Sequence, residues 1–417
     1  MADPKVTQAV AQLYDTYPFP PEPILDVPPP GYNWRWHWGA AYSFCSNGVL
    51  PSHQRPRILD AGCGSGVSTE YLAHLNPGAD IVGIDISAGT LAVAQERINR
   101  TCPPDKYVST HGERTIEFRH LSLFDADQLE GQFDLINSVG VLHHTADPVR
   151  GIQALAAKLA PGGIFHIFVY AAIGRWEISL MQQALALLAQ ANPESQGDFR
   201  RGVKLGRDVF AALPEANRLV QREKQRWAME NQRDECFADM YLHPQEIDYT
   251  IESLFELIDA SGLEFVGFSN PQVWSLLRLL GKNPELLAQA EQLSQREQYR
   301  LIELLDTDIT HYEFFLAKPP FDRANWEDDH NLLAAVPLRH PCLEGWPSHL
   351  LFDADYQVVS LSEADLAFMH GCDGASTVAE ILATLHQDEV NLAVVRDLLG
   401  RRLVVVKGSS TTVHSSN

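Results

Sequence analysis

The chain has 417 residues, enough for two or three domains with a sizeable core. Acidic residues outnumber basic ones by 54 to 32, and the resulting net charge of −22 repels a phosphate backbone and argues against nucleic-acid binding. The chain has no apolar run of about 20 residues, no signal-peptide pattern at its start and no CxxC pair among its scattered cysteines. We therefore expect a protein of the reducing cytoplasm, without a metal site or a membrane partner. The oligomeric state is not indicated.

Residues 1–50 are rich in proline and aromatic residues, as in "YDTYPFPPEP" and "NWRWHWGAAY". Prolines at this density interrupt regular elements, so we expect an arm that runs extended over a surface. Two interpretations of its aromatic side chains stay open. They either close over a ligand and line an acceptor pocket, or they cover a sheet edge or a helix surface.

Between residues 56 and 171, short apolar runs alternate with helix-like stretches. This alternation is typical of βαβ units and of a parallel sheet with helices on both faces. Five strands are expected, at Arg57–Asp60, Asp80–Asp85, Ile116–His120, Asp134–Val139 and Ile164–Tyr170. The turn Pro161-Gly162-Gly163 is expected to end the helix that precedes the fifth strand.

Residues 172–240 show a helical pattern without strands and are expected to form a lid inserted into this domain. A strand at Leu263–Phe268, a helical stretch at 274–305 and a last strand in "THYEFFLAK" follow. Residues 51–318 are therefore predicted to form an α/β domain around a doubly wound sheet of seven strands.

A polar linker at 319–333 leads to a small α+β module at 334–408, with short strands, helices and the terminal strand "RRLVVVKG". The tail at 409–417 is expected to be disordered. Because the linker has the composition of an exposed connector, we expect truncation after about residue 325 to leave a folded protein that binds its ligand.

The stretch after the first strand, "LDAGCGSG", indicates the kind of ligand. Its three glycines have the spacing G-x-G-x-G: Gly62, Gly64 and Gly66. A dinucleotide site needs G-x-G-x-x-G, but Val67 takes the place of the third glycine, and a phosphate-binding loop would need a lysine. Asp60, directly before the glycines, opposes a phosphate and favours an ammonium or a sulfonium group. Asp85 ends the second strand, where a carboxylate accepts hydrogen bonds from ribose hydroxyls.

With these residues in place, "LDAGCGSG", "GIDIS", "LFDADQ" and "FDLINSVGVLHHTADP" resemble the successive motifs of the class I S-adenosylmethionine-dependent methyltransferases. The resemblance covers about Arg57–Leu316. It implies a Rossmann-like sheet whose last strand is antiparallel, S-adenosyl-L-methionine as the cofactor, and methyl transfer as the activity. The cofactor-binding set that it implies is Asp60, Gly62, Cys63, Gly64, Gly66, Asp85, Ile86, Phe124, Asp125, Ser138 and Val139.

The same resemblance implies roles for these residues. Asp60 and the first two glycines would hold the methionine part of the cofactor, and Asp85 would bind the ribose. Ile86 would pack on the adenine and Asp125 would accept its amino group, although an aspartate here also fits a plain helix cap. Ser138 and Val139 would form the floor beneath the methyl group.

Four residues are candidates for catalysis. A general base is needed only where the acceptor is protonated, since alignment supplies most of the acceleration for an activated methyl donor. His143 and His144 follow the fourth strand on the expected substrate side, where His144 also fits a loop cap. Asp239, Tyr241 and His243 lie in a strand-like segment after the lid, "DMYLHPQE", which either returns its side chains to the pocket or is a surface turn. The predicted catalytic set is His143, His144, Asp239 and His243.

The acceptor is unidentified. A small organic molecule is favoured because a large aromatic lid is the usual lining of a small-molecule pocket. A peptide or protein acceptor is the alternative, because Asp373-Gly374 and Thr377–Ile381 resemble the small winged-helix domains related to the peptide chaperone of pyrroloquinoline quinone biosynthesis. Such domains hold a peptide by strand addition, and the basic helix needed to read DNA is absent. A nicotinamide oxidoreductase, which Val67 disfavours, and a cofactor-binding protein without turnover are the remaining alternatives.

Overall fold

The computed structural model describes residues 4–102, 115–191, 197–385 and 390–408. At its centre lies a sheet of seven strands in the order β3-β2-β1-β4-β5-β7-β6. The first five strands run parallel, while β7 pairs antiparallel with both β5 and β6. This arrangement confirms the predicted methyltransferase-like sheet. The strands are β1 Arg57–Ala61, β2 Asp80–Asp85, β3 Ile116–His120, β4 Phe133–Val139, β5 Leu159–Tyr170, β6 Glu264–Phe268 and β7 His311–Ala317.

Successive residues of these strands face opposite sides of the sheet, as the period of two requires. Ile58 packs into one hydrophobic core and its neighbour Leu59 into another, and Phe315 and Phe314 divide in the same way. Helices cover both cores. One face carries α3 Val67–Leu75 and α4 Ala88–Thr101, and the other carries α5 Pro148–Lys158 and α10 Ile251–Ser261.

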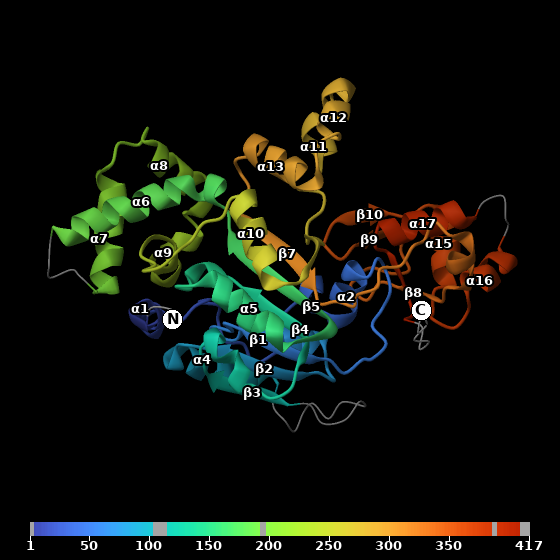
Figure 1. Cartoon of the computed structure of the whole chain (residues 1–417), viewed down its shortest axis with the longest axis horizontal. Coiled ribbons are helices and arrows are strands. Elements are labelled where there is room, and N and C mark those ends of the chain that lie inside the picture. Colours follow the sequence, from blue (N-terminus) through green and yellow to red (C-terminus); the bar gives the residue numbers. More distant parts are fainter. Residues whose placement is uncertain (1–3, 103–114, 192–196, 386–389, 409–417) are drawn as a thin grey trace.

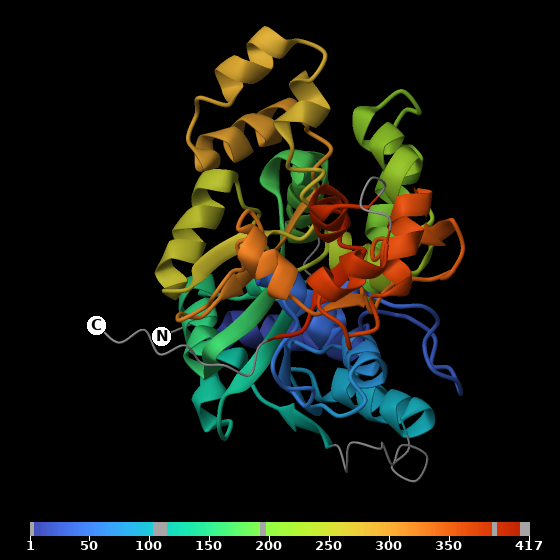
Figure 2. The same cartoon turned by 90° about the vertical axis from the view of Figure 1, so that its right-hand side faces the viewer.

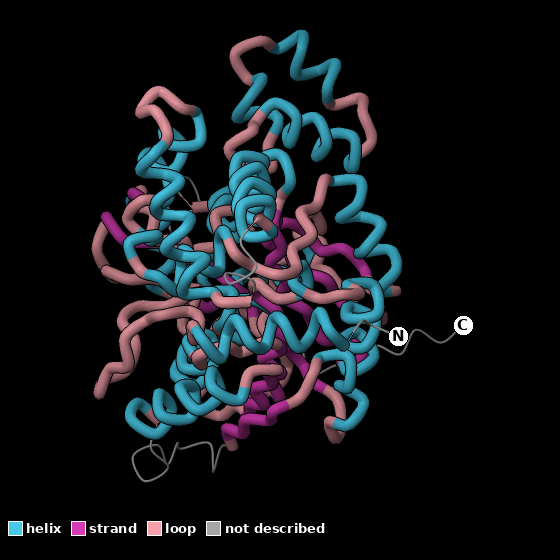
Figure 3. Tube along the Cα trace, turned by 90° about the vertical axis from the view of Figure 1, so that its left-hand side faces the viewer, coloured by secondary structure: helices cyan, strands magenta, loops and turns pink. Residues whose placement is uncertain are grey.

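A helical lid follows β5, as predicted, and lies at one end of the sheet (Figure 1). Figure 3 views the molecule from the lid's side, where helices and loops predominate. The lid helices are α6 Ala172–Gln190, α7 Phe199–Ala212, α8 Arg218–Arg222 and α9 Asp234–Tyr241. Among the described residues, no helix has the length and apolar character needed to cross a membrane.

The prediction that the N-terminal arm runs extended is wrong for its two ends. Pro4–Thr16 form helix α1 and Trp38–Cys45 form helix α2, with a short 3-10 turn at Trp34–Trp36. The reason is the distribution of the arm's prolines. All but one lie within residues 18–30, and the remaining one is at the first position of α1, where a helix accepts proline. Between the two helices the chain has no regular element until residue 34.

Three further local predictions need correction. Strand β5 begins at Leu159, before the Pro161-Gly162-Gly163 turn, because the strand pairs with Phe133 and then resumes after a register shift. The segment around Asp239 is not strand-like but forms the last turn of helix α9. The stretch at 274–305 is three short helices, α11 Leu276–Leu280, α12 Pro284–Ala290 and α13 Gln295–Leu305, because Gly281 and a serine cap interrupt it.

The C-terminal module has its own hydrophobic core, which combines two small antiparallel sheets with four helices. Its elements are α14 Asp329–Ala334, β8 Pro337–Arg339, β9 Leu350–Phe352, β10 Val358–Ser360, α15 Glu363–His370, α16 Val378–Thr384, α17 Leu392–Gly400 and β11 Val404–Val406. The predicted linker therefore contains a helix, since α14 begins within it. The predicted disordered tail at 409–417 lies outside the described residues.

The module rests directly on the N-terminal arm, as Figure 2 shows from the module's side. Val406 exchanges backbone hydrogen bonds with Gly48 and Leu50, at 2.8 and 2.7 Å. The Arg402 guanidinium lies 3.9 Å from the ring centre of Trp34, whose indole N–H donates to the Asp355 carboxylate at 2.7 Å. The second half of the arm, around Trp34 and α2, is thus enclosed between the sheet and the module, whereas α1 packs on α4 and on the lid helices.

Candidate active site

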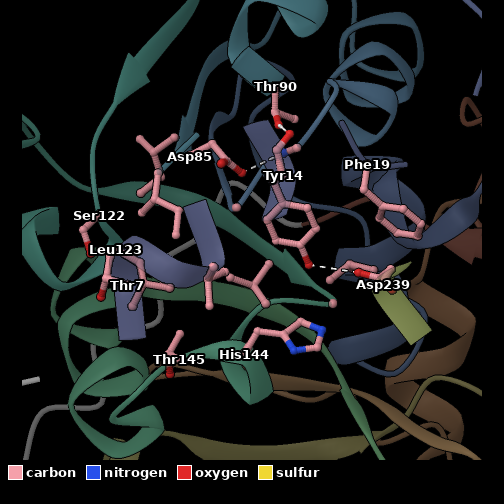
Figure 4. A pocket seen from close by; sticks show the side chains of 18 of the residues that line it. Thr7, Tyr14, Phe19, Asp85, Thr90, Ser122, Leu123, His144, Thr145 and Asp239 are labelled. Carbon is pink, nitrogen blue, oxygen red and sulfur yellow. Dashed lines mark hydrogen bonds between the residues drawn. The ribbon is translucent and has the colours of Figure 1, made fainter. Parts of the chain in front are cut away.

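A cavity of about 320 Å³ lies at the carboxyl edge of strands β1, β2 and β4, beneath helix α1. Its lining comes from segments far apart in the sequence, and Figure 4 shows their side chains converging. We call one part the glycine end, formed by Gly62, Gly64, Asp85, Ile86 and Phe124. We call the other part the tyrosine end, formed by Tyr14, His144, Tyr170 and Asp239.

The glycine turn is shaped by the arm that packs on it. Gly64 has a φ of +53°, and a Cβ there would lie 2.4 Å from the carbonyl oxygen of Phe19. Only glycine accepts both the left-handed conformation and this close approach. The same carbonyl accepts a hydrogen bond from the Ser65 N–H at 2.9 Å. The bare backbone therefore serves two purposes, since it lines the cavity and seats the arm over it.

Asp85 lines the glycine end at the tip of β2. Its two carboxylate oxygens accept hydrogen bonds from the backbone N–H groups of Gly64 and Ser87, at 3.0 and 2.9 Å. Burial raises the pKa of Asp85, while these N–H donors act in the opposite direction. A carboxylate held in this way at a strand tip has the placement that ribose hydroxyls require.

Asp60 lies beneath the turn and does not line the cavity. Its carboxylate accepts hydrogen bonds from the hydroxyls of Ser68 and Thr69 at 2.7 and 2.6 Å, and from the side-chain amide of Asn137 at 2.8 Å. Burial raises its pKa against the effect of these three donors. The carboxylate thus ties the turn after β1 to helix α3 and to strand β4.

The structure divides the predicted cofactor-binding set. The residues that line the cavity are Gly62, Gly64, Asp85, Ile86, Phe124 and Val139. The lining does not include Asp60, Cys63, Gly66, Asp125 and Ser138. Cys63 and Ser138 are buried, and Gly66 lies where a Cβ would meet the backbone of Ala94 at 2.9 Å, so it permits close packing of α3 on α4.

At the tyrosine end, the phenol of Tyr14 joins two of the predicted catalytic residues. Its hydroxyl donates to Asp239 at 3.0 Å and lies 3.2 Å from Nε2 of His243 (Figure 4 shows the first of these bonds). The Gln245 N–H donates to Nδ1 of His243 at 3.2 Å, so in the neutral ring Nε2 carries the proton. A directed network results, in which His243 donates to Tyr14 and Tyr14 donates to Asp239.

Asp239 is the titratable carboxyl group of this end. Burial raises its pKa to about 7, and the hydrogen bond from Tyr14 only partly offsets this rise. A carboxyl group with a pKa near 7 exchanges protons readily at neutral pH. The sequence placed Asp239 on a strand-like segment. In the structure it lies at the end of helix α9 and lines the cavity.

The two neighbouring histidines differ in position. His144 lines the cavity, and its Nδ1 lies 2.9 Å from the Gln245 carbonyl, so Nδ1 carries the proton and Nε2 keeps its lone pair. Burial lowers the pKa of His144 to about 3. His143 does not line the cavity, and neither of its ring nitrogens has a hydrogen-bond partner among the described residues. It packs against Tyr170, with 4.0 Å between ring centres.

His144, Asp239 and His243 offer ligand atoms within 4.8 Å of one another, close enough to hold a metal ion. The hydrogen bonds favour a proton network instead. A metal on Nε2 of His243 would require the proton on Nδ1, which the Gln245 N–H already faces as a donor. Tyr14 also occupies the space between Asp239 and His243.

Two residues of the tyrosine end were not among the predicted catalytic residues. Tyr14 comes from helix α1, and the aromatic surplus of the arm was its only sequence signal. Tyr170 ends strand β5 and lies on the guanidinium of Arg175, with 3.4 Å to the ring centre. Arg175 is itself held by Glu246 at 2.9 Å, so a buried ion pair supports the wall of the cavity.

The comparison with known families agrees with this site. A family model described as "Methyltransferase domain" matches residues 59–165, from within β1 to within β5, including the glycine turn. The glycine turn with its bare backbone, the acid at the tip of β2 and the cavity between them fit S-adenosylmethionine. The chain is an S-adenosylmethionine-dependent methyltransferase.

Similar proteins place the chain more narrowly. An uncharacterized protein of Synechococcus sp., syc1184_c, is 56% identical over 410 residues, which cover 97% of this chain and 94% of the relative. The chain belongs to the family of that protein. An "Uncharacterized phycocyanin operon protein W" of Pseudanabaena tenuis is 73% identical over 101 residues, which cover 24% of this chain and 94% of the relative.

A solved structure shares the fold. PKMT2 from Rickettsia typhi has a TM-score of 0.57 at 14% identity, covering 91% of this chain and 76% of that one.

Proposed function

We propose that the chain moves the methyl group of S-adenosylmethionine to a side chain of a protein or peptide. The observation that carries the choice of acceptor is the size of the cavity. At about 320 Å³ it lies near the lower end of the range of roughly 300–1,000 Å³ for sites that hold one drug-sized ligand. The cofactor is a ligand of that size, so the acceptor has room to insert only a slender group.

The glycine end is the proposed cofactor site. Asp85 accepts hydrogen bonds from the ribose hydroxyls, Ile86 and Phe124 contact the adenine, and the methionine part lies against the bare backbone of Gly62 and Gly64. Asp60 acts from beneath, by holding the turn in position. When bound, the cofactor supplies an activated methyl group on a sulfonium centre, so alignment of the acceptor is the main task of the protein.

The tyrosine end is the proposed acceptor site. Asp239, with its pKa raised to about 7 by burial, takes the proton of the acceptor as the new bond to carbon forms. Tyr14 orients this carboxylate, and His243 fixes the direction of the Tyr14 hydroxyl. Nε2 of His144 accepts a hydrogen bond from the acceptor, since it has a lone pair and faces the cavity.

The name of one relative supplies a first acceptor to test. Because the Pseudanabaena protein is named for a phycocyanin operon, phycocyanin is a reasonable protein substrate. The sequence had favoured a small organic acceptor. The volume of the cavity leaves room for a slender group, and the name of the Pseudanabaena protein is the reason to propose that a protein carries it.

The experiment is a labelling assay with the full chain, a cofactor labelled in its methyl group, unmethylated phycocyanin and a cell extract separated into proteins and metabolites. We expect label in phycocyanin or in another protein. Label that enters only metabolites would contradict the proposed acceptor class, and no transfer to either fraction would contradict turnover. The variant Asp85→Ala serves as the cofactor-binding control.

A further inference from the structure

A chain of buried polar side chains leads from the glycine turn towards the C-terminal module. Asn137 donates to Asp60 at 2.8 Å, and Nδ1 of His166 lies 2.8 Å from the Asn137 amide oxygen. Nε2 of His166 lies 3.1 Å from Glu313, which forms an ion pair with Arg35 at 2.7 Å. Four separate segments of the chain, β1, β4, β5 and β7, therefore meet in one hydrogen-bonded row that ends at the arm.

The orientation of the Asn137 amide is fixed by an unambiguous donor. The indole N–H of Trp36 lies 3.0 Å from the same Asn137 oxygen, and an indole nitrogen never accepts. The oxygen must therefore face Trp36 and His166, and the amide nitrogen must face Asp60. It follows that Nδ1 of His166 carries a proton, because it faces an oxygen that only accepts.

The other nitrogen of His166 faces a carboxylate. Glu313 is paired with Arg35 and accepts from Ser269 at 2.7 Å, and these partners and His166 lower the pKa of Glu313 to about 2 against the effect of its burial. An ionised carboxylate only accepts, so Nε2 of His166 must donate as well. The His166–Glu313 pair then carries one extra proton, compared with a neutral imidazole beside an ionised carboxylate.

The charges around His166 decide whether such a state is sustained. Burial opposes the charge on the ring and lowers its pKa, as does the Arg35 cation, whereas Glu313 and Asp60 favour the charge. His166 is fully buried, so losing the proton would leave a lone pair directly facing a carboxylate. Each nitrogen faces an oxygen without a proton to give, and this requirement for two donors acts against the lowering of the His166 pKa by burial.

We propose that His166 and Glu313, which hold this shared proton between them, are positioning residues for the cofactor. They fix the position of Asn137, and Asn137 fixes the position of Asp60. Asp60 then fixes the glycine turn that forms the glycine end of the cavity. The proposal concerns cofactor affinity and is independent of the nature of the acceptor.

The test uses the full chain with Glu313→Gln, whose side chain has the same shape but no charge. Nitrogen NMR of the histidine rings at neutral pH is expected to show both nitrogens of His166 protonated in the wild type and only one in the variant. Calorimetry is expected to show S-adenosylhomocysteine binding weakened by roughly tenfold, the effect of one lost charge-assisted hydrogen bond.

The matched control is Glu303→Gln. Like Glu313, Glu303 is paired with an arginine, Arg300, but it is more deeply buried and lies on helix α13, where it accepts from Tyr312. This variant is expected to leave both the His166 spectrum and the affinity unchanged. A neutral His166 in the wild type, or an unchanged affinity in Glu313→Gln, would overturn the proposal.

If Glu313→Gln does not fold, Trp36→Phe makes the same test. It replaces the indole by a smaller phenyl ring and removes the donor that fixes the Asn137 oxygen. The expected result is a several-fold loss of affinity for S-adenosylhomocysteine at neutral pH, and an unchanged affinity in this variant would also overturn the proposal.

Discussion

The two ends of the cavity are built in different ways. The glycine end uses the segments that follow consecutive parallel strands, so its residues lie between Gly62 and Phe124 and its hydrogen bonds come mainly from the backbone. The tyrosine end joins helix α1 to helix α9, and its key hydrogen bond connects residues that are 225 positions apart. In the proposed function, backbone geometry therefore serves the cofactor, which is common to many methyl transfers, and side chains on separate helices serve the acceptor, which differs between them.

Among the variants that test the division between the two ends, Asp239→Asn is expected to have the largest effect. The amide keeps the hydrogen bond to Tyr14 but takes no proton, so kcat is expected to fall by about a hundredfold or more. The affinity for S-adenosylhomocysteine should stay within about twofold, since the proposed cofactor site is at the other end. Rates are measured on the protein fraction identified by labelling, and affinities by calorimetry. A parallel loss of rate and affinity would break the division between the ends.

Truncation after residue 325 is expected to have the next largest effect. The sequence predicted a separable module, but the contacts of Val406 with Gly48 and Leu50 and of Arg402 with Trp34 now argue for a structural role. Their loss should lower stability by about 2–3 kcal/mol, a typical value for exposing a buried cluster. Thermal melting measures this effect. An unchanged melting temperature with unchanged cofactor affinity would support the separable module instead.

Tyr14→Phe is expected to have a smaller effect. The ring still fills the tyrosine end, but Asp239 loses its hydrogen bond and its pKa rises further. We expect kcat to fall by about tenfold at neutral pH, with partial recovery at higher pH as the carboxyl group ionises. Tyr17→Phe, one turn further along the chain, is the control. A rate that falls equally at every pH would contradict an effect through Asp239.

The smallest effect is the pH dependence of the wild type. Asp239 must be ionised to take a proton, so kcat/KM is expected to rise with pH up to its pKa of about 7 and then to level off. Below that pH the rate falls by about tenfold per unit. In Asp239→Asn the fall of kcat/KM at low pH should disappear. A fall that persists would assign the titration to another group.

The sequence predicted the sheet and the position of the glycine turn because their signals are local, while the role of the turn in cofactor binding stays a prediction. The sheet, the turn and Asp85 follow from alternating apolar runs and from the residues directly after them. The role of Tyr14 was not predicted, because nothing near it in sequence indicates that α1 reaches α9. Asp239 was selected for its residue type, but its helix was missed, since a short polar segment before Pro244 has no clear period.

The network behind Asp60 shows a second limit. Asn137, His166 and Glu313 each lie within an apolar strand, where a single polar residue has no sequence pattern to mark it. Only the pairing of β4 with β5 and of β5 with β7 brings them together. A buried polar row across several strands therefore depends on sheet order, which only the whole fold supplies.

The central claim, that the glycine end is the cofactor site, is tested most directly by calorimetry of S-adenosylhomocysteine with the wild type, Asp85→Ala and Asp80→Ala. Asp80 begins the same strand that Asp85 ends, and its carboxylate accepts from Thr115 away from the cavity. The account predicts that the wild type and Asp80→Ala bind with similar affinity, while Asp85→Ala loses about a hundredfold or more, the effect of two lost charge-assisted hydrogen bonds. Equal affinity in all three proteins, or no binding by the wild type, would contradict it.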